Sequence, residues 1–247
     1  TRCFTRDITG RKRAEEALRE ADQRKDEFLA SLAHELRNPL APLRNAVAIL
    51  QRCPPADAIP PVVGMMDRQL GQLVRLVDDL LDVSRVSQGK ITLRPEPLDL
   101  REVVGAAVET SRPVVEAHHH VLRVHLPDAP LPVIGDRTRL AQVLTNLLNN
   151  AAKYTPDGGR IEVTAGRDGA TVVVRVVDTG VGIPADMLPR VFDLFTQVGR
   201  SLDRAQGGLG IGLSLVQKLV GMHGGTVTAE SPGPGLGSTF AIRLPAG

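Results

Sequence analysis

The sequence predicts a chain in two parts, an α-helical hairpin followed by an α/β sandwich with a mixed sheet. Three observations lead to this fold class. Apolar residues recur three or four positions apart through the first part of the chain, which is the spacing of amphipathic helices. The composition changes after Gly89, where Pro95 and Pro97 break the helical pattern and indicate a linker. Beyond Leu98, helical stretches are mixed with β-branched runs, which is typical of an α/β domain.

The first helix is expected to run from Arg11 to about Gln51, because this stretch favours helix formation. The segment from Cys53 to Pro61 cannot continue it, since its prolines lack the amide donor and clash with the preceding turn. The apolar stripe of this helix is formed by Phe28, Leu29, Leu32, Leu36, Leu40, Leu43, Val47 and Leu50.

A second helix is expected after Pro61. Its stripe steps by alternating threes and fours, so the two helices are predicted to form an antiparallel hairpin. Two helices alone bury little apolar surface, and such a hairpin usually completes its core by pairing with a second copy. We therefore expect a homodimer with a four-helix bundle. The stripe consists of Val63, Met66, Leu70, Leu73, Val77, Leu80 and Ser84.

The second part mixes helices and strands without regular alternation. A doubly wound nucleotide fold needs that alternation, so a mixed sheet covered by helices is predicted instead. The expected helices are Leu100 to Ala117, Asp136 to Lys153 and Gly212 to His223. The expected strands are Val121 to Leu126, Ile161 to Ala165, Thr171 to Asp178, Thr226 to Ala229 and Thr239 to Leu244.

Composition narrows the class of protein. The chain is 42% hydrophobic and 23% charged, which is ordinary for a globular protein, and its net charge of +2 comes from residues of both signs spread along the chain. Such a pattern argues against nucleic acid as a partner. Apolar runs are too short to cross a bilayer. Cys3 and Cys53 have neither metal-ligand nor disulfide spacing, which fits a reducing cytoplasm.

The first helix carries a candidate nucleophile in the string HELRNP at residues 34–39. Leu32 and Leu36 are expected to face the bundle, so His34, two positions from each, should point towards solvent. Glu35 can accept the proton of one imidazole nitrogen and leave the other as a neutral nucleophile, which is how carboxylates usually orient catalytic histidines.

Two further residues of this string add to the argument. Asn38 lies one turn beyond His34 on the same face of the helix. Pro39 inside a helix costs about 3 kcal/mol and is expected to bend it just past the histidine. A lone His-Glu pair is more often an ordinary surface histidine, but the proline and the domain that follows favour a function.

The helix expected at residues 136–153 has a polar face formed by Asn146, Asn150 and Lys153. An amide oxygen can ligate Mg²⁺ and an ammonium group can neutralise phosphate, so this face suits a metal triphosphate. An asparagine-rich face taken alone is more often solvated surface or a set of caps. The glycine-rich segments that follow it favour the functional interpretation.

Two glycine-rich segments complete the candidate pocket. Residues 178–183 read DTGVGI and close a β-branched run, so Asp178 at the strand end can accept a hydrogen bond from an exocyclic amine. Residues 207–213 read GGLGIGL and enter a helix, whose amide donors favour phosphate. Alone, the first is usually a turn and the second a hinge. Neither is a Walker-type loop, because no Gly-Lys-Ser/Thr follows.

These strings resemble the sequence boxes of sensor histidine kinases. The string at residues 34–39 resembles the phosphoacceptor box, which implies that His34 is phosphorylated, that Glu35 is the general base and that Asn38 positions water for dephosphorylating a partner regulator. Residues 146–154, 178–183, 192–195 and 207–213 resemble, in order, the N, G1, F and G2 boxes of the kinase ATP-binding domain, whose fold is of the Bergerat type.

The resemblance also implies cofactors and binding residues. ATP and Mg²⁺ are the expected cofactors, with Asp178 recognising the adenine amino group and Asn150 ligating the metal. Residues 196–206 would be a lid, and residues 235–239 resemble the closing glycine-containing strand entry. The remaining residues implied to contact the nucleotide or shape its pocket are Asn146, Lys153, Tyr154, Gly180, Gly182, Gly208, Gly210, Gly212 and Leu213.

The start of the chain resembles the end of a PAS sensor domain running into a signalling coil. The predicted domains are therefore residues 1–12 as a PAS end, 13–94 as the coil and phosphotransfer hairpin, and 95–247 as the catalytic domain. The implied partners are an upstream sensor and the receiver domain of a response regulator, whose aspartate takes the phosphoryl group.

Two alternatives stay open. A clamp-type ATPase of the same nucleotide fold explains the pocket strings but leaves residues 34–39 without a role. A non-catalytic dimerisation module would need broken nucleotide strings, and they are intact. The run His118-His119-His120 is not predicted to bind metal, because consecutive positions cannot converge on one ion.

Overall fold

The computed structural model describes residues 9–52, 55–87, 91–196 and 210–247 of the chain. These residues form two compact units. The first extends to Val77, and the second comprises the described residues from Asp78 onward. The fold class predicted from the sequence is confirmed, with a helical hairpin followed by an α/β domain that contains a mixed sheet.

The hairpin consists of α1 (Thr9–Leu50), a single 3-10 turn η1 (Ala56–Ala58) and α2 (Ile59–Ser87). Helix α1 remains helical through both Pro39 and Pro42. The prediction that Pro60 and Pro61 lie outside the second helix is wrong, because both belong to the first turn of α2. Proline is tolerated there, since the first amide groups of a helix have no intrahelical acceptor.

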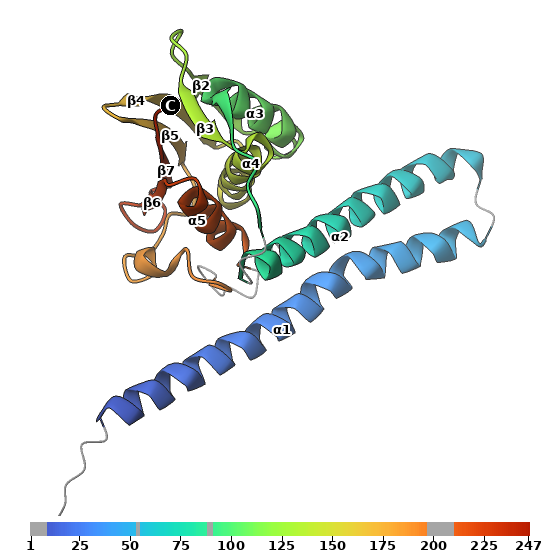
Figure 1. Cartoon of the computed structure of the whole chain (residues 1–247). Helices are drawn as coiled ribbons and strands as arrows, with labels where there is room; N and C mark the ends of the chain where they lie inside the picture. The colour runs from blue at the N-terminus through green and yellow to red at the C-terminus, as the bar shows by residue number, and fades with distance from the viewer. Residues whose placement is uncertain (1–8, 53–54, 88–90, 197–209) are drawn as a thin grey trace, which may run out of the picture. The chain divides into compact units, whose positions relative to one another are not determined.

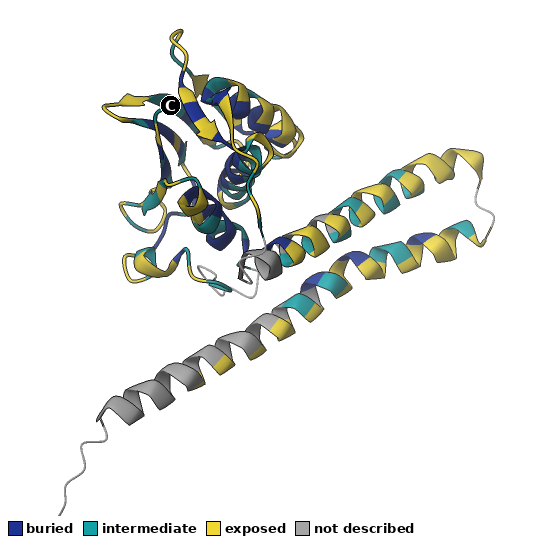
Figure 2. Ribbon diagram, viewed as in Figure 1, coloured by how far each residue is buried: buried dark blue, intermediate teal, exposed yellow. Residues whose placement is uncertain are grey.

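The apolar residues of the hairpin divide between two faces. Ala46 of α1 is fully buried, and the buried positions of α1 lie on the side that faces α2 (Figures 1 and 2). A second set of large apolar side chains stays in contact with solvent, including Leu40 at 52% exposure and Leu70 at 56%. The two helices therefore bury only part of their apolar surface against each other.

The second unit is built on a five-stranded sheet in the order β2-β4-β5-β7-β6. Strand β2 pairs parallel to β4, and the other neighbours are antiparallel, so the sheet is mixed. Helices α3, α4 and α5 lie together over one face of it (Figure 1). The strands are β2 (Val121–His125), β4 (Arg160–Asp168), β5 (Thr171–Asp178), β6 (Thr226–Glu230) and β7 (Ser238–Pro245).

The three helices bury their apolar faces against this sheet. They are α3 (Leu100–Ala117), α4 (Arg137–Tyr154) and α5 (Gly212–Met222), each within one residue of its predicted end. Their buried leucines and valines form one continuous core with the inward side chains of β4, β5 and β7. A short turn η2 (Leu188–Arg190) lies in the connection between β5 and α5.

The second unit also contains a two-stranded sheet that was not predicted from the sequence. Strand β1 (Glu96–Asp99), which lies where Pro95 and Pro97 were predicted to mark a linker, pairs antiparallel with β3 (Pro132–Gly135), for which no strand was predicted. Proline weakens the strand signal because it cannot donate to a ladder. Each of these strands contains a proline, and in a ladder of two short strands every residue lies at an edge, where proline is tolerated.

Asp99 holds the start of α3 in place. Its carboxylate caps α3 by accepting from the Arg101 backbone amide at 3.1 Å, and it also accepts from the Leu131 amide at 3.1 Å. The Arg101 guanidinium donates to both carboxylate oxygens, and this contact lowers the pKa of Asp99 to about 2. The Asp99 carboxylate therefore stays ionised at any pH well above that value.

Within the second unit, a buried carboxylate ties the last turns of α2 to α4. Asp82, which is 8% exposed, accepts hydrogen bonds from Arg139 Nη1 and Gln142 Nε2, both at 2.7 Å. Both donors lie in the first turns of α4. Removing either donor would leave the buried charge less compensated, which is costly in a protein interior.

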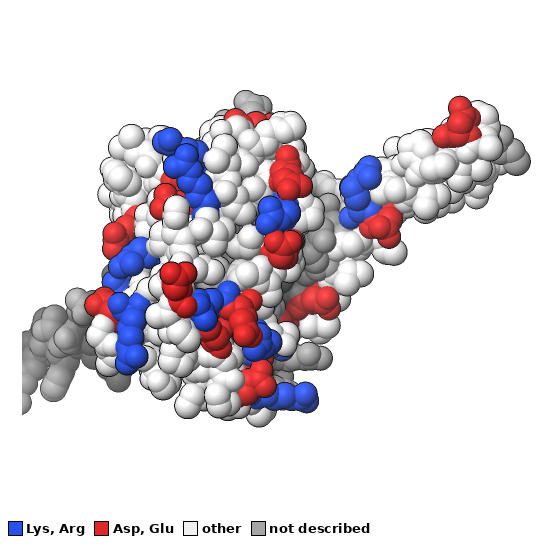
Figure 3. Space-filling view, turned by 90° about the horizontal axis from the view of Figure 1, so that it is seen from above, with Lys and Arg blue, Asp and Glu red and all other residues white. Residues whose placement is uncertain are grey.

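Two observations concern nucleic-acid binding and membrane-spanning helices. On the face seen in Figure 3, positive and negative side chains alternate and do not form a basic stripe. Within the described residues, every helix is too short or too polar to be a membrane-spanning segment.

Candidate functional site

A pocket that is open to solvent lies in the second unit between α4, the loop that follows β5, the start of α5 and strand β7. Four segments that are distant in sequence meet here, and most of the lining is apolar. The lining residues are Asn150, Ala151, Tyr154, Asp178, Val181, Gly182, Ile183, Val191, Thr196, Leu213, Ser238 and Phe240.

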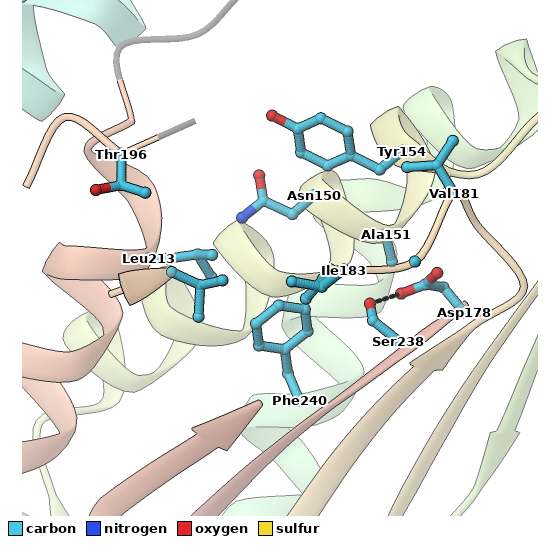
Figure 4. Close-up of a pocket in the computed structure, with 12 residues that line it drawn as sticks. Asn150, Ala151, Tyr154, Asp178, Val181, Ile183, Thr196, Leu213, Ser238 and Phe240 are labelled. Carbon is cyan, nitrogen blue, oxygen red and sulfur yellow. Dashed lines mark hydrogen bonds between the residues drawn. The ribbon is translucent and has the colours of Figure 1, made fainter. Parts of the chain in front are cut away.

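Asp178 is the single carboxylate in this lining. It is the last residue of β5, and it is 6% exposed. One carboxylate oxygen, Oδ1, accepts from the Gly180 amide at 2.7 Å, and the other, Oδ2, accepts from the Ser238 hydroxyl of β7 (Figure 4). Each carboxylate oxygen has two lone pairs, so the group retains capacity for another donor. A buried, oriented acceptor of this kind selects a ligand that carries an amine or amide N–H.

The loop after Asp178 is held by backbone contacts on both sides. The Val181 amide donates to the Tyr154 carbonyl oxygen at 3.0 Å, which ties the loop to the end of α4. Gly182 has φ +67°, a conformation that other residues adopt only with strain. A Cβ atom at Gly182 would also lie 2.0 Å from the Gly233 carbonyl oxygen. Glycine is therefore required here both by conformation and by space.

Helix α4 contributes two of the four predicted side chains to the pocket. Asn150 and Tyr154 line it, as shown in Figure 4. Lys153 does not, and its Nζ lies 4.8 Å from the centre of the Tyr154 ring. Asn146 does not line it either, although its Nδ2 is buried and has no hydrogen-bond partner among the described residues.

The glycine-rich segment before α5 is only partly described, since Gly208 lies outside the described residues. Gly210 has φ +65°, and its carbonyl oxygen accepts from the Phe195 amide at 3.0 Å. Gly212 begins α5, where an added Cβ would come within 4.0 Å of the Asn150 Nδ2. Leu213 lines the pocket as predicted. The first amides of α5 are thus directed to the same region as the polar face of α4.

The predicted phosphoacceptor residues lie in the first unit, on α1. The side chain of His34 lies outside the described residues, so its expected exposure stays a prediction. Asn38 is exposed, one turn further along the helix. Glu35 is buried at 7% exposure. Burial limits the motion of this carboxylate, as an orienting role next to His34 requires.

The apolar wall of the pocket was not predicted from the sequence. Val181, Ile183, Val191 and Phe240 supply much of the lining, and Phe192 packs edge-on against Phe240 with ring centres 6.4 Å apart. A flat aromatic ligand is accommodated by such a wall. The available signal was the burial expected for the apolar residues next to the glycines, but the pattern alone did not show which of them face the core and which face a ligand.

Pocket and polar face together suit one class of ligand. The apolar wall and the Asp178 carboxylate accommodate a flat ring that bears an amine, and the Asn150 amide and the first amides of α5 lie towards the opposite end. Amide oxygens are ligands that Mg²⁺ accepts, and the helix terminus favours phosphate. The residues present therefore fit an adenine nucleotide with a divalent cation.

Comparison with known families divides the chain into two matches. Residues 24–89 match the His Kinase A (phospho-acceptor) domain. Residues 135–247 match the family described as histidine kinase-, DNA gyrase B-, and HSP90-like ATPase. The first match contains residues 34–39, and the second contains every residue of the pocket.

Individual relatives agree with these matches. The chain is 36% identical over 251 residues to the sensor histidine kinase RcsC of Escherichia coli, covering 98% of this chain and 26% of RcsC. It is 37% identical to the histidine protein kinase DivJ of Caulobacter vibrioides, covering 97% of this chain and 42% of DivJ. The chain thus spans less than half the length of these relatives.

Two solved structures share the fold. Full-length ShkA in complex with AMPPNP is 28% identical, with a TM-score of 0.65 over 88% of this chain and 45% of ShkA. The mycobacterial sensor histidine kinase MprB is 31% identical, with a TM-score of 0.54 over 62% of this chain and 98% of that one.

The geometry of the loop after β5 predicts the effect of adding one methyl group. Gly182→Ala should lower the free energy of unfolding by about 2 kcal/mol more than Gly169→Ala does, because overpacking adds about 1–3 kcal/mol to the strain of a positive φ. Gly169 is the matched control, since it also has a positive φ but open space around its Cα. Urea denaturation followed by circular dichroism measures the difference, and equal losses for the two variants would contradict the packing argument.

Proposed function

Because the chain belongs to the sensor histidine kinases, with a phospho-acceptor domain followed by the kinase-type ATPase domain, we propose that it binds ATP and transfers the γ-phosphoryl group to its own His34. One observation carries the proposal. The buried, hydrogen-bonded carboxylate of Asp178 lies in an apolar pocket of a chain that also matches a phospho-acceptor domain at residues 24–89.

We assign the Asp178 end of the pocket to adenine. The exocyclic amine of adenine is a donor that a carboxylate can accept, and the Ser238 hydroxyl holds the carboxylate in one orientation. The ring would lie against Val181, Ile183 and Phe240. ShkA, which shares this fold, was crystallised in complex with AMPPNP, an ATP analogue. This complex supports the proposal that the pocket of the present chain binds an adenine nucleotide.

The triphosphate is assigned to the other end of the pocket. Asn150 would hold Mg²⁺ through its amide oxygen, and when bound the cation would neutralise charge that develops on the phosphate oxygens. Lys153, next to the pocket on α4, and the first amides of α5 supply further positive charge. Asn146, Gly208, Gly210 and Gly212 are proposed to support this end without all of them touching ligand, and Gly180, whose amide donates to Asp178, is proposed to shape the adenine end.

We propose that His34 is the nucleophile. A neutral imidazole nitrogen of His34 attacks the γ-phosphorus in line, the bond between that phosphorus and the bridging oxygen breaks, and ADP leaves. Glu35 accepts a hydrogen bond from the N–H of the other ring nitrogen, stabilises the ring as positive charge develops, and takes this proton as general base, so that the phosphorylated ring is neutral. The product is a phosphohistidine, which can donate its phosphoryl group to an aspartate.

The partners follow from the two domains. We propose that the receiver domain of a response regulator takes the phosphoryl group. A second copy of this chain would cover the apolar side chains that the hairpin leaves exposed, such as Leu40, Leu70 and Val74. Residues 1–12 are proposed to be the end of a PAS sensor, with a cytoplasmic location for the kinase.

The clamp-type ATPase is the second candidate. It would use the same pocket, and the family that matches residues 135–247 includes gyrase- and HSP90-like ATPases. It gives no role to the phospho-acceptor match at residues 24–89, so we place the kinase first.

The kinase proposal predicts the fate of the γ-phosphate. Incubation of the chain with γ-labelled ATP and Mg²⁺ should give an acid-labile label on the protein, since phosphohistidine hydrolyses in acid. His34→Gln should reduce the label to background, because glutamine cannot act as the nucleophile. Phosphate released equally by both proteins, with no labelled chain, would favour the ATPase instead.

A role for Asn38 in dephosphorylation predicts a separable effect. Asn38 lies on an exposed part of α1, one turn beyond His34, where its amide can orient water. Asn38→Ala should slow removal of phosphate from a phosphorylated response regulator at least tenfold while His34 is still labelled. An Asn38→Ala chain that dephosphorylates the regulator at the normal rate would rule out this role.

A further inference from the structure

The hydroxyl group of Ser231 connects two loops that lie next to the pocket. Ser231 follows β6 and begins the connection to β7, and its Oγ donates to the Gly237 carbonyl oxygen at 2.7 Å. The same oxygen accepts from the Ile183 amide at 2.9 Å and from the Gly233 amide at 3.3 Å. One side chain therefore satisfies three backbone groups, and one of these belongs to a residue that lines the pocket.

Among the described residues, the other hydrogen bonds between these loops do not replace the contact of Ser231 with Ile183. The Gly235 amide donates to Val181 at 2.6 Å, and the Gly237 amide donates to Gly180 at 3.0 Å. Both of these are backbone contacts near the beginning of the loop that follows β5. At the far end of this loop, where the lining residue Ile183 is buried at 7% exposure, the Ile183 amide donates to the Ser231 hydroxyl oxygen.

Packing makes the position of Gly182 and Ile183, at the far end of the loop after β5, sensitive to Ser231. Gly182 is pressed against Gly233, since a Cβ there would lie 2.0 Å from the Gly233 carbonyl oxygen and 3.2 Å from Ser231 Oγ. Ser231 also holds Gly233 through its amide. Loss of the hydroxyl would release both the surface against which Gly182 packs and the amide of its neighbour Ile183. A buried amide left without an acceptor favours a shifted loop.

We propose that Ser231 is a positioning residue that sets nucleotide affinity by fixing the Gly182–Ile183 wall of the pocket. Ser231 does not line the pocket, so it acts through the loop and not by touching the ligand. The inference rests on the proposed ATP-binding function and extends it to a residue outside the glycine-rich strings. Because the loop contacts the base end of the pocket, the effect should appear in nucleotide binding and not in the transfer of phosphate.

The test compares Ser231→Ala and Ser231→Thr with two controls in the whole chain. Thr228→Val also deletes a hydroxyl, on the preceding strand, but that buried hydroxyl has no hydrogen-bond partner among the described residues. Val115→Ala removes core packing in α3, at a residue that is 2% exposed and outside the pocket, and so lowers stability alone. Calorimetry gives the Kd for Mg-ATP, and labelling of His34 over a range of ATP concentrations gives KM and kcat.

The proposal expects Ser231→Ala to raise Kd and KM at least fivefold, with kcat at saturating ATP within twofold of wild type. Ser231→Thr retains the hydroxyl and should recover most of the affinity. Thr228→Val and Val115→Ala should bind as wild type does. If Ser231→Ala binds ATP as tightly as wild type, or if Val115→Ala weakens binding equally, the positioning role is overturned. A wild-type chain that binds no ATP would instead overturn the proposed function itself.

Discussion

The buried carboxylate of Asp178 is the constraint on which the pocket depends. It lies at the end of β5, between the Gly180 amide and the Ser238 hydroxyl, so it joins the turn after one strand to the start of its neighbour β7. A buried charge is tolerated only when donors surround it, and these two donors also fix its direction. The carboxylate fixes the start of the glycine turn through the Gly180 amide, and the adenine proposal rests on its fixed orientation and its capacity for another donor.

Helix α4 shows how one element serves both the core and the site. Its leucines are buried under the sheet, while Asn150 and Tyr154 on another part of its surface line the pocket. The loop after β5 is tied to the end of the same helix through the Tyr154 carbonyl oxygen. The core therefore positions the polar residues of the site through a rigid helix, and the pocket does not need its own stabilising contacts at every residue.

Much of this could be predicted from the sequence, because the periodic helices and the strings with glycines and asparagines have strong local signals. Helix α3 and strand β5 begin and end where they were expected. The small sheet of β1 and β3 was missed, since proline masks the strand pattern and pairing over a long sequence separation has no local signature. Ser231 was missed for a related reason, because its role depends on two loops that meet only after folding.

The central claim is that the Asp178 pocket binds the adenine of ATP, and titration calorimetry with Mg-ATP on Asp178→Asn tests it most directly. The substitution keeps the shape of the side chain but replaces one acceptor oxygen by a donor amide, which opposes both the Ser238 hydroxyl and an adenine amine. The account predicts a loss of affinity of at least tenfold, while the exposed control Asp186→Asn binds as wild type does. Unchanged affinity in a folded Asp178→Asn chain would contradict the account.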